Sequence, residues 1–377
     1  MTTRRIAVLG AGNGGHAMAA QKSLEGFEVS LFELPSFAEK LRRVLETREI
    51  TIQWNDRMET AKIFQVTMDI ASALRQAEIV YVVTPAFGHR HMAELCASHL
   101  ARGQVLCLMP GSGGSLEFAK VVRDLGGKPG VLFCESSTLP YGARLTAPGQ
   151  IRVFVEALAL PTGVFPSTET EAAIDKLHDV YRSTIAANNV LEAALNNPNP
   201  IVHPAATLLN AGRIEFAEGQ FYLYKEGMTP SVARIYEAME RERFALLHAL
   251  GLKYHHCAGL EPGEYSLGES VEECHDHILK TSMDAAFGPG SIEPGIQMKG
   301  PASMRDRFIT EDVPYGLVLM ATLGRMLGVP TPMADAVVNL CGAINRTDYW
   351  QAGRGTERLG LAGMSLKELK TFLETGQ

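Results

Sequence analysis

The chain has 377 residues, a length that suits two domains better than one small domain. Hydrophobic residues make up 46% and charged residues 20% of it, which excludes general disorder because such a chain can bury a sizeable core. The net charge is −7 and no basic block occurs, so the composition argues against a protein that binds nucleic acid.

Features related to targeting and redox state indicate the cell interior. No apolar run reaches the roughly 18 residues that a membrane-spanning helix needs, so no membrane partner is expected. A signal peptide is not expected either, since a strand and a glycine loop follow the first few residues. The six cysteines include no CxxC pair and are ordinary for a reducing compartment. We therefore expect a cytoplasmic protein without disulfides.

The first half of the chain alternates short apolar runs with helical stretches. This alternation predicts an α/β domain with a doubly wound parallel sheet and helices on both faces. Helices are expected at 14–25, 89–100 and 116–125. The expected strands lie at 6–9, 28–33, 62–68, 78–84, 104–109 and 131–135, with a final strand at 151–158.

After about residue 169 the strand-like runs give way to helical periods. Thr229 and Pro230 predict the start of a long helix, because Thr can cap it and Pro tolerates its first position; Gly251 would end it. Residues 365–368 (SLKE) match a capping box and predict a short final helix. The change in pattern predicts one domain over residues 1–185 and a helical one over 186–377.

The strongest local signal is a glycine loop, G-x-G-x-x-G, that follows a buried strand and opens a helix. Gly10 permits the tight turn, Gly12 lets the backbone approach a pyrophosphate, and Gly15 lets the helix pack close to the strand. A purely structural glycine turn is the alternative interpretation. The pattern favours a dinucleotide-binding (Rossmann) domain whose cofactor contacts include Gly10, Gly12, Asn13, Gly14 and Gly15.

Glu33 ends the second expected strand, 23 residues after Gly10. An acidic side chain there accepts hydrogen bonds from the adenosine ribose hydroxyls and repels a 2′-phosphate, which favours NAD over NADP. Arg42 and Arg43 follow, and they would accommodate that phosphate if they fold back.

Two later loops lie where strands end, which is where a doubly wound sheet binds its ligand. One holds Pro85 and Ala86, and the other spans residues 110–114 (PGSGG). We expect them to line the nicotinamide half of the cofactor site. Ordinary turn chemistry is the alternative.

The second half holds the candidate chemistry. Prolines pin the backbone on both sides of His203, just before an expected helix over 205–215, and a histidine titrates near neutral pH. A structural or surface histidine is the alternative. Arg307 could clamp a carboxylate and Asp312 could orient a histidine, although a solvated charged loop would also fit.

Histidines and cysteines also cluster at 255–257 (HHC) and 274–277 (CHDH). They could supply ligands to zinc, but the spacing matches no standard pair, so no metal is predicted. Surface histidines on an irregular segment are the favoured interpretation.

Motifs along nearly the whole chain, weakest over 255–303, together resemble the opine dehydrogenase family. That family includes octopine dehydrogenase and bacterial N-(carboxyalkyl)amino acid dehydrogenases. The motifs that carry the resemblance are GAGNGGHA at 10–17, His203-Pro204, LLNAGR at 208–213, the spacing of Arg307 and Asp312, TPMAD at 331–335 and RLGLAG at 358–363.

The resemblance implies a Rossmann domain, then an all-helical domain like the C-terminal domain of 6-phosphogluconate dehydrogenase. It implies that an amino acid and a 2-oxo acid such as pyruvate condense to an imine, which NAD(P)H reduces. By analogy His203 is the acid/base, Asp312 its helper or the partner of the amine, Arg307 a carboxylate anchor, and Asn199 a group that polarises the carbonyl. Two product carboxylates need cations, so Arg144 is a second candidate anchor.

Two other functions stay open at this point. A 3-hydroxyacid or glycerol-3-phosphate-like dehydrogenase would call for a catalytic lysine early in the helical domain, but residues 188–203 contain none. A non-catalytic sensor would bind NAD(H) through the first domain alone. The sequence leaves the oligomeric state open, a homodimer included.

Overall fold

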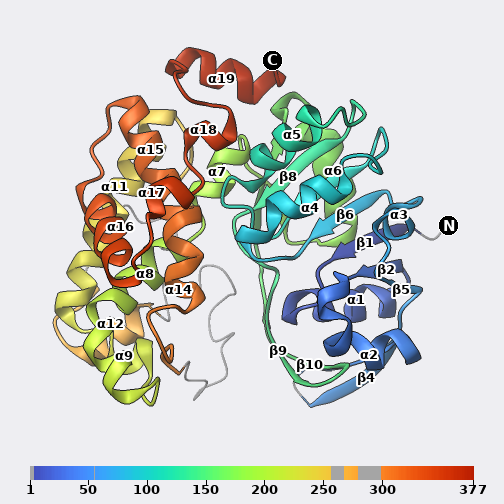
Figure 1. Ribbon diagram of the computed structural model, residues 1–377, viewed down its shortest axis with the longest axis horizontal. Helices are drawn as coiled ribbons and strands as arrows, with labels where there is room; N and C mark the ends of the chain where they lie inside the picture. Colours follow the sequence, from blue (N-terminus) through green and yellow to red (C-terminus); the bar gives the residue numbers. More distant parts are fainter. Residues whose placement is uncertain (1–3, 55, 256–266, 279–298) are drawn as a thin grey trace. The chain divides into compact units, whose positions relative to one another are not determined.

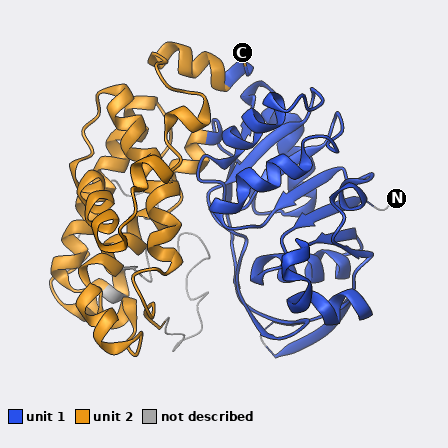
Figure 2. Ribbon diagram, in the orientation of Figure 1, with its two compact units in different colours: residues 1–190, 374–376 blue, residues 191–373, 377 orange. Residues whose placement is uncertain are grey.

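The computed structural model describes residues 4–54, 56–255, 267–278 and 299–377. It divides into two compact units (Figure 2). Unit 1 comprises residues 1–190 and 374–376, and unit 2 comprises residues 191–373 and 377.

Unit 1 is built on an eight-stranded sheet (Figure 1). All neighbouring strands in it run parallel except one pair, which is antiparallel. The sheet order is β12 (Thr184–Ala186), β11 (Leu160–Phe165), β8 (Leu132–Ser136), β7 (Val105–Leu108), β6 (Ile79–Val82), β1 (Arg5–Leu9), β2 (Glu28–Phe32) and β5 (Gln65–Thr67), with β8 and β11 antiparallel.

The expected doubly wound sheet is therefore confirmed, with differences at its edges. Strand β11 was not expected. The strand expected at 62–68 shortens to β5, and β12 forms after residue 169, where no strand was expected. Each of these two strands has only three residues, too few to show an apolar period.

A second sheet of four strands was missed. Its order is β4 (Arg57–Lys62), β3 (Glu49–Trp54), β10 (Gln150–Glu156) and β9 (Tyr141–Ala147). The strand expected at 151–158 as the last one of the main sheet is β10, so that placement was wrong. In β4 only Ala61 is buried, which explains why no apolar run marked it.

Helix α1 (Asn13–Leu24) contacts strands of both sheets (Figure 1). It is therefore buried on most of its circumference, from Gly14 through Ala20 and again at Lys22. The main apolar core joins the sheet to the helices α3 (Ile70–Leu74), α4 (His89–Cys96) and α5 (Gly114–Asp124). The remaining helices of unit 1 are η1 (Pro35–Phe37), α2 (Ala38–Thr47), η2 (Ala86–Gly88), η3 (Ser167–Glu169) and α6 (Thr170–Val180).

Unit 2 is helical throughout its described residues, apart from one bridge between Tyr222 and Lys299. Helices α8 and α11 lie at its centre, since each contacts α16 and they contact each other. The helices are α7 (Val190–Leu195), α8 (Asn199–Leu209), α9 (Ala211–Ala217), α10 (Leu223–Glu226), α11 (Pro230–Leu250), α12 (Val271–Ile278), α14 (Arg307–Thr310), the π-helix η6 (Val313–Leu317), α15 (Val318–Leu327), α16 (Pro332–Asn345), α17 (Tyr349–Ala352), α18 (Thr356–Leu359) and α19 (Leu366–Thr375).

The expected helix ends in unit 2 are largely confirmed. Helix α11 begins at Pro230 and ends at Gly251, whose φ of 72° suits glycine, although the Thr229 side chain makes no capping bond. The capping box before α19 forms: the Glu368 carboxylate accepts from the Ser365 N–H at 2.8 Å, and the Glu368 N–H donates to Ser365 Oγ at 3.3 Å.

The helix expected at 205–215 is instead two helices, α8 and α9, separated at Asn210. His203 therefore lies inside α8 and not at a helix start, so that expectation was wrong. Pro204 is the sixth of the eleven residues of α8, and because it has no N–H it removes one helical hydrogen bond.

Within the described residues, no helix is long and apolar enough to cross a membrane. Five cysteines are free and buried: Cys96, Cys107, Cys134, Cys274 and Cys341. Cys257 lies outside the described residues.

Candidate active site

The glycine loop joins β1 to α1, and the space available for a side chain differs from one of its glycines to the next. Gly10 has φ of 107°, and a Cβ there would lie 2.8 Å from the carbonyl oxygen of Val83. A Cβ on Gly15 would lie 1.8 Å from the Gly10 carbonyl oxygen. A Cβ on Gly12 would meet nothing within 4 Å, so open space faces the loop at that position. The loop thus fits a pyrophosphate at Gly12, next to the N-terminus of α1.

Asn13, the first residue of α1, ties the loop to the second sheet. Its Oδ1 accepts from the Leu145 N–H of β9 at 2.9 Å. Gly14 has no room for a side chain, because a Cβ would lie 2.9 Å from Leu139 and Val83. Arg144 is exposed next to Leu145, so the structure places this candidate carboxylate anchor beside the glycine loop.

Glu33 follows β2, and its carboxylate turns toward the glycine loop. Oε2 accepts from the Ala11 N–H at 2.8 Å, and Oε1 accepts from the Leu34 N–H at 2.8 Å. Each oxygen keeps a further lone pair, so the carboxylate can still accept from two ribose hydroxyls.

The two loops at the ends of β6 and β7 are held by buried polar residues that the sequence analysis missed. Pro85 and the buried Ala86 lead into η2, and the buried His89 contacts the Thr84 carbonyl oxygen through Nε2 at 3.3 Å. The fully buried Glu135 accepts from the N–H groups of Gly113 and Ser115, at 2.8 Å and 2.9 Å. The sequence feature that could have revealed Glu135 is the presence of an acidic residue at the end of the apolar run 131–135.

In unit 2 the structure brings His203 and Asp312 together. His203 Nδ1 lies 2.8 Å from Asp312 Oδ2, although the two residues are 109 positions apart. Their side chains are only 14% and 12% exposed, so little water competes for the contact. Nδ1 is thereby engaged with the carboxylate, and Nε2 has no hydrogen-bond partner among the described residues. A neutral imidazole held in this way presents Nε2 as a proton acceptor.

Two aromatic residues lie beside the imidazole of His203, and neither was predicted. Phe308 of α14 stacks on the ring, with centroids 4.0 Å apart and an interplanar angle of 18°. Tyr224 of α10 lies with its ring centroid 6.4 Å away. Burial, with a smaller effect of the Asp312 carboxylate, raises the pKa of Tyr224, so its hydroxyl stays protonated.

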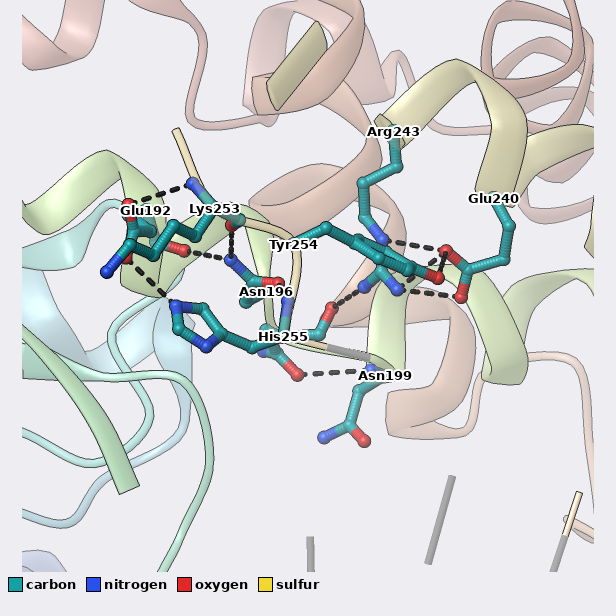
Figure 3. Close-up of polar contacts among 9 residues, drawn as sticks. Glu192, Asn196, Asn199, Glu240, Arg243, Lys253, Tyr254 and His255 are labelled. Carbon is teal, nitrogen blue, oxygen red and sulfur yellow. Dashed lines mark hydrogen bonds and ion pairs between the residues drawn. The ribbon is translucent and has the colours of Figure 1, made fainter. Parts of the chain in front are cut away.

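Asn199 is the first residue of α8, and buried charges hold it in place (Figure 3). Its N–H donates to Asn197 Oδ1 at 3.0 Å, and Arg243 Nη1 donates to the Asn197 carbonyl oxygen at 3.0 Å. Arg243, only 2% exposed, also forms a bidentate pair with the buried Glu240 on α11. In Figure 3 the Asn199 amide extends away from this network, and its side chain has no partner among the described residues.

Arg307 lies at the start of α14, four residues before Glu311. Its Nε is 3.1 Å from Glu311 Oε2, and its side chain is 63% exposed. The structure thus places this candidate anchor in an ion pair with the residue that follows its own helix, five residues before Asp312.

The two histidine and cysteine groups are only partly described. His256 and Cys257 lie outside the described residues, as does the side chain of His275. Among the residues that the structure does describe, no group of three or more side chains could hold a metal ion.

Comparison with known proteins decides the family. Residues 186–345 match the description NAD/NADP octopine/nopaline dehydrogenase, alpha-helical domain. Residues 5–111 match the N-terminus of NAD-dependent glycerol-3-phosphate dehydrogenase. An opine dehydrogenase of Arthrobacter sp. (strain 1C) is 34% identical over 99% of this chain and 99% of its own length. The chain belongs to the opine dehydrogenase family.

More distant members show the same relationship. The octopine dehydrogenase of Mizuhopecten yessoensis is 24% identical over 89% of this chain and 88% of its own length. Among solved structures, octopine dehydrogenase in complex with NADH and agmatine has a TM-score of 0.73 at 17% identity, covering 100% of this chain and 98% of that one. An NADP+-bound yersinopine dehydrogenase has a TM-score of 0.72 at 16% identity, covering 99% and 98%.

These findings confirm the predicted resemblance and the predicted fold of a Rossmann domain followed by a helical domain. Membership of the opine dehydrogenase family makes the protein an NAD(P)-dependent oxidoreductase acting on a CH–NH group. It does not favour the hydroxyacid dehydrogenase or the non-catalytic sensor.

Replacing Gly15 by alanine should destabilise unit 1, because the new Cβ would overlap the Gly10 carbonyl oxygen. We expect a loss of about 1–3 kcal/mol in the free energy of unfolding, measured by urea denaturation. Gly12→Ala is the matched control: it should keep the unfolding midpoint but weaken NADH binding, since its Cβ fills the open space. Equal midpoints for the two variants would contradict this assignment.

Proposed function

We propose that this opine dehydrogenase condenses the amino group of an amino acid with a 2-oxo acid such as pyruvate and reduces the imine with NADH. Residues 1–185 would bind the cofactor and residues 186–377 the two substrates. The observation that carries the proposal is the contact of His203 with Asp312. Condensation requires proton transfer, and an imidazole oriented by a carboxylate can perform it.

The preference for NADH over NADPH rests on Glu33. Its carboxylate is anchored beside the glycine loop by Ala11, where it would accept from the ribose and repel a 2′-phosphate. Of the two arginines that could bind such a phosphate, Arg42 pairs with Glu39 on α2. Arg43 lies near Gly149: a Cβ added to this glycine would be 3.4 Å from the arginine Cδ.

The remaining cofactor contacts are assigned to the glycine loop and the loop after β6. Gly10, Gly12, Asn13, Gly14 and Gly15 would surround the pyrophosphate, with Pro85 and Ala86 nearer the nicotinamide. When bound, the reduced nicotinamide supplies the hydride that reduces the imine carbon.

Condensation places two protons on the carbonyl oxygen, which leaves as water: one comes from His203 and one from the substrate nitrogen, so the imine forms in its protonated state. We assign the oxygen side of this transfer to Nε2 of His203. It gives a proton to the oxygen as the C–N bond forms, takes the proton that the nitrogen then loses, and gives it to the departing hydroxyl. Asp312 holds Nδ1–H and stabilises the imidazolium between these steps.

The other candidate residues would bind and polarise the substrates. The side-chain amide of Asn199 is available to donate to the carbonyl oxygen, one helical turn before His203 on α8. Arg307 and Arg144 stay candidate carboxylate anchors. Arg307 has the stronger support, because it belongs to the same unit as His203 and Asp312.

A paired-substrate assay tests the proposed function. NADH oxidation is measured with pyruvate or other 2-oxo acids, each with and without a panel of amino acids. We expect turnover that requires both substrates. Turnover with the oxo acid alone would instead support a hydroxyacid dehydrogenase, and the absence of turnover with every pair would contradict the proposal.

His203→Ala should lower kcat by about 10²–10⁴-fold, because the proton-transfer group is lost. The Kd for NADH, measured by fluorescence titration, should stay unchanged. His248→Ala, on the exposed side of α11, is the matched control and should keep normal turnover. Near-normal turnover of His203→Ala would remove this residue from the mechanism.

Glu33→Ala should weaken NADH binding by about tenfold or more, since hydrogen bonds from a carboxylate to the ribose are lost. NADPH binding should weaken less or improve, because the repulsion of the 2′-phosphate is also removed. Glu46→Ala, at an exposed position of α2, controls for charge in the same region. An equal loss for both cofactors would argue against the ribose contact.

A further inference from the structure

Unit 2 contains a second imidazole–carboxylate pair, formed by His255 and Glu192 (Figure 3). His255 Nε2 lies 2.9 Å from Glu192 Oε1, and the Lys253 N–H donates to Glu192 Oε2 at 3.0 Å. Asn196 completes the arrangement: its Oδ1 accepts from the His255 N–H at 2.7 Å, and its Nδ2 donates to the Lys253 carbonyl oxygen at 2.8 Å. Four hydrogen bonds therefore attach residues 253–255 to Glu192 and Asn196.

The burial of this pair is unequal, and the inequality suits proton transfer. Glu192 is 0% exposed, so its carboxylate must be compensated by the hydrogen bonds it accepts. The His255 side chain is 22% exposed, and within the described residues its ring bonds to Glu192 alone. With Nε2–H donating to the carboxylate, Nδ1 carries a free lone pair and acts as a base.

Hydrogen bonds to Asn196 place the His255–Glu192 pair close to the start of α8. Asn196, which holds the His255 backbone, precedes Asn199 by three residues, and α8 then carries His203 about one turn further on. Tyr254 hydrogen-bonds through its hydroxyl to Glu240 at 3.1 Å, within the ion pair that holds Asn197. The other titratable groups of this network are Lys253, Tyr254, Glu240 and Arg243.

The proposed condensation needs a base for the substrate ammonium group before the C–N bond forms. An amino acid arrives as an ammonium ion, and only its free amine can attack a carbonyl carbon. His203 must be protonated at that moment in order to give its proton to the carbonyl oxygen. A separate base for the ammonium leaves His203 free to keep its own proton for the carbonyl oxygen until the amine attacks.

We propose that His255, held by Glu192, binds the ammonium group of the amino acid substrate and accepts its first proton at Nδ1. This proposal rests on the proposed function. The nitrogen lone pair then forms the C–N bond, the π electrons of the carbonyl move to oxygen, and His203 protonates that oxygen. After hydride transfer, His255 returns its proton to the secondary amine of the product, and His203 regains one from solvent.

His255→Gln tests the base, since the amide keeps a hydrogen bond to Glu192 but cannot take a proton. At pH 7, we expect kcat/KM for the amino acid to fall by about 10²-fold, with an unchanged Kd for NADH. The deficit should shrink as pH rises toward the pKa of the substrate amine, because the free amine then arrives from solution. Initial rates at pH 7, 8 and 9 measure this trend.

Glu192→Gln is the second variant, and it keeps the attachment of residues 253–255. The amide oxygen still accepts from the Lys253 N–H, but the amide N–H now donates to His255 Nε2, which leaves the proton on Nδ1. We expect the same loss and the same pH trend as for His255→Gln. His248→Gln on α11 is the matched surface control and should behave as the wild type.

The outcomes separate this proposal from the proposed function. A kcat/KM within twofold of the wild type at pH 7 for either variant would overturn it, as would a deficit of equal size at all three pH values. If His255→Gln fails to fold, judged by thermal unfolding, Glu192→Gln alone decides. Failure of the proposed function appears elsewhere, as wild-type protein without paired-substrate turnover or as full activity of His203→Ala.

Discussion

The contact between His203 Nδ1 and Asp312 is the constraint that fixes the imidazole within the helical unit. It joins α8 to the residue just before η6, across 109 positions of sequence, and Phe308 stacks on the same ring. An imidazole needs such a partner to present one defined tautomer. Because α8 carries this histidine, the contacts that hold the start of α8 also set the position of His203. One of these contacts is the hydrogen bond that Arg243 donates to the Asn197 carbonyl oxygen.

Buried charges recur wherever the structure must hold a loop or a helix start in one geometry. Glu135 holds the loop after β7, Glu240 and Arg243 hold the residues before α8, and Glu192 holds residues 253–255. Removing an ion from water is unfavourable, and well-packed apolar residues often stabilise a core as well or better. These charges are therefore better explained by the positions they define than by the stability they add.

The sequence was most informative where chemistry is local. The glycine loop, six strands of the main sheet and the ends of α11 follow from short patterns of glycine, proline and apolar residues. Strand β4 was missed because it is exposed on most of its length. Strand β10 was assigned to the wrong sheet because the sequence of one strand does not show which strands it pairs with. The resemblance suggested His203 and Asp312 together, but Glu192 and His255 lie 63 positions apart, and only the folded chain shows their contact.

The position of α1 between two sheets has a consequence for how this domain can change over evolutionary time. A helix packed against strands of two sheets cannot shift without separating from one of them, so the packing of α1 restrains the glycine loop at its N-terminus. A different nucleotide must then be accommodated by substituting side chains around an immobile frame. Glu33 and the exposed arginines of α2 are where such substitutions would act, because the Glu33 carboxylate faces the glycine loop and the arginine side chains lie at the surface.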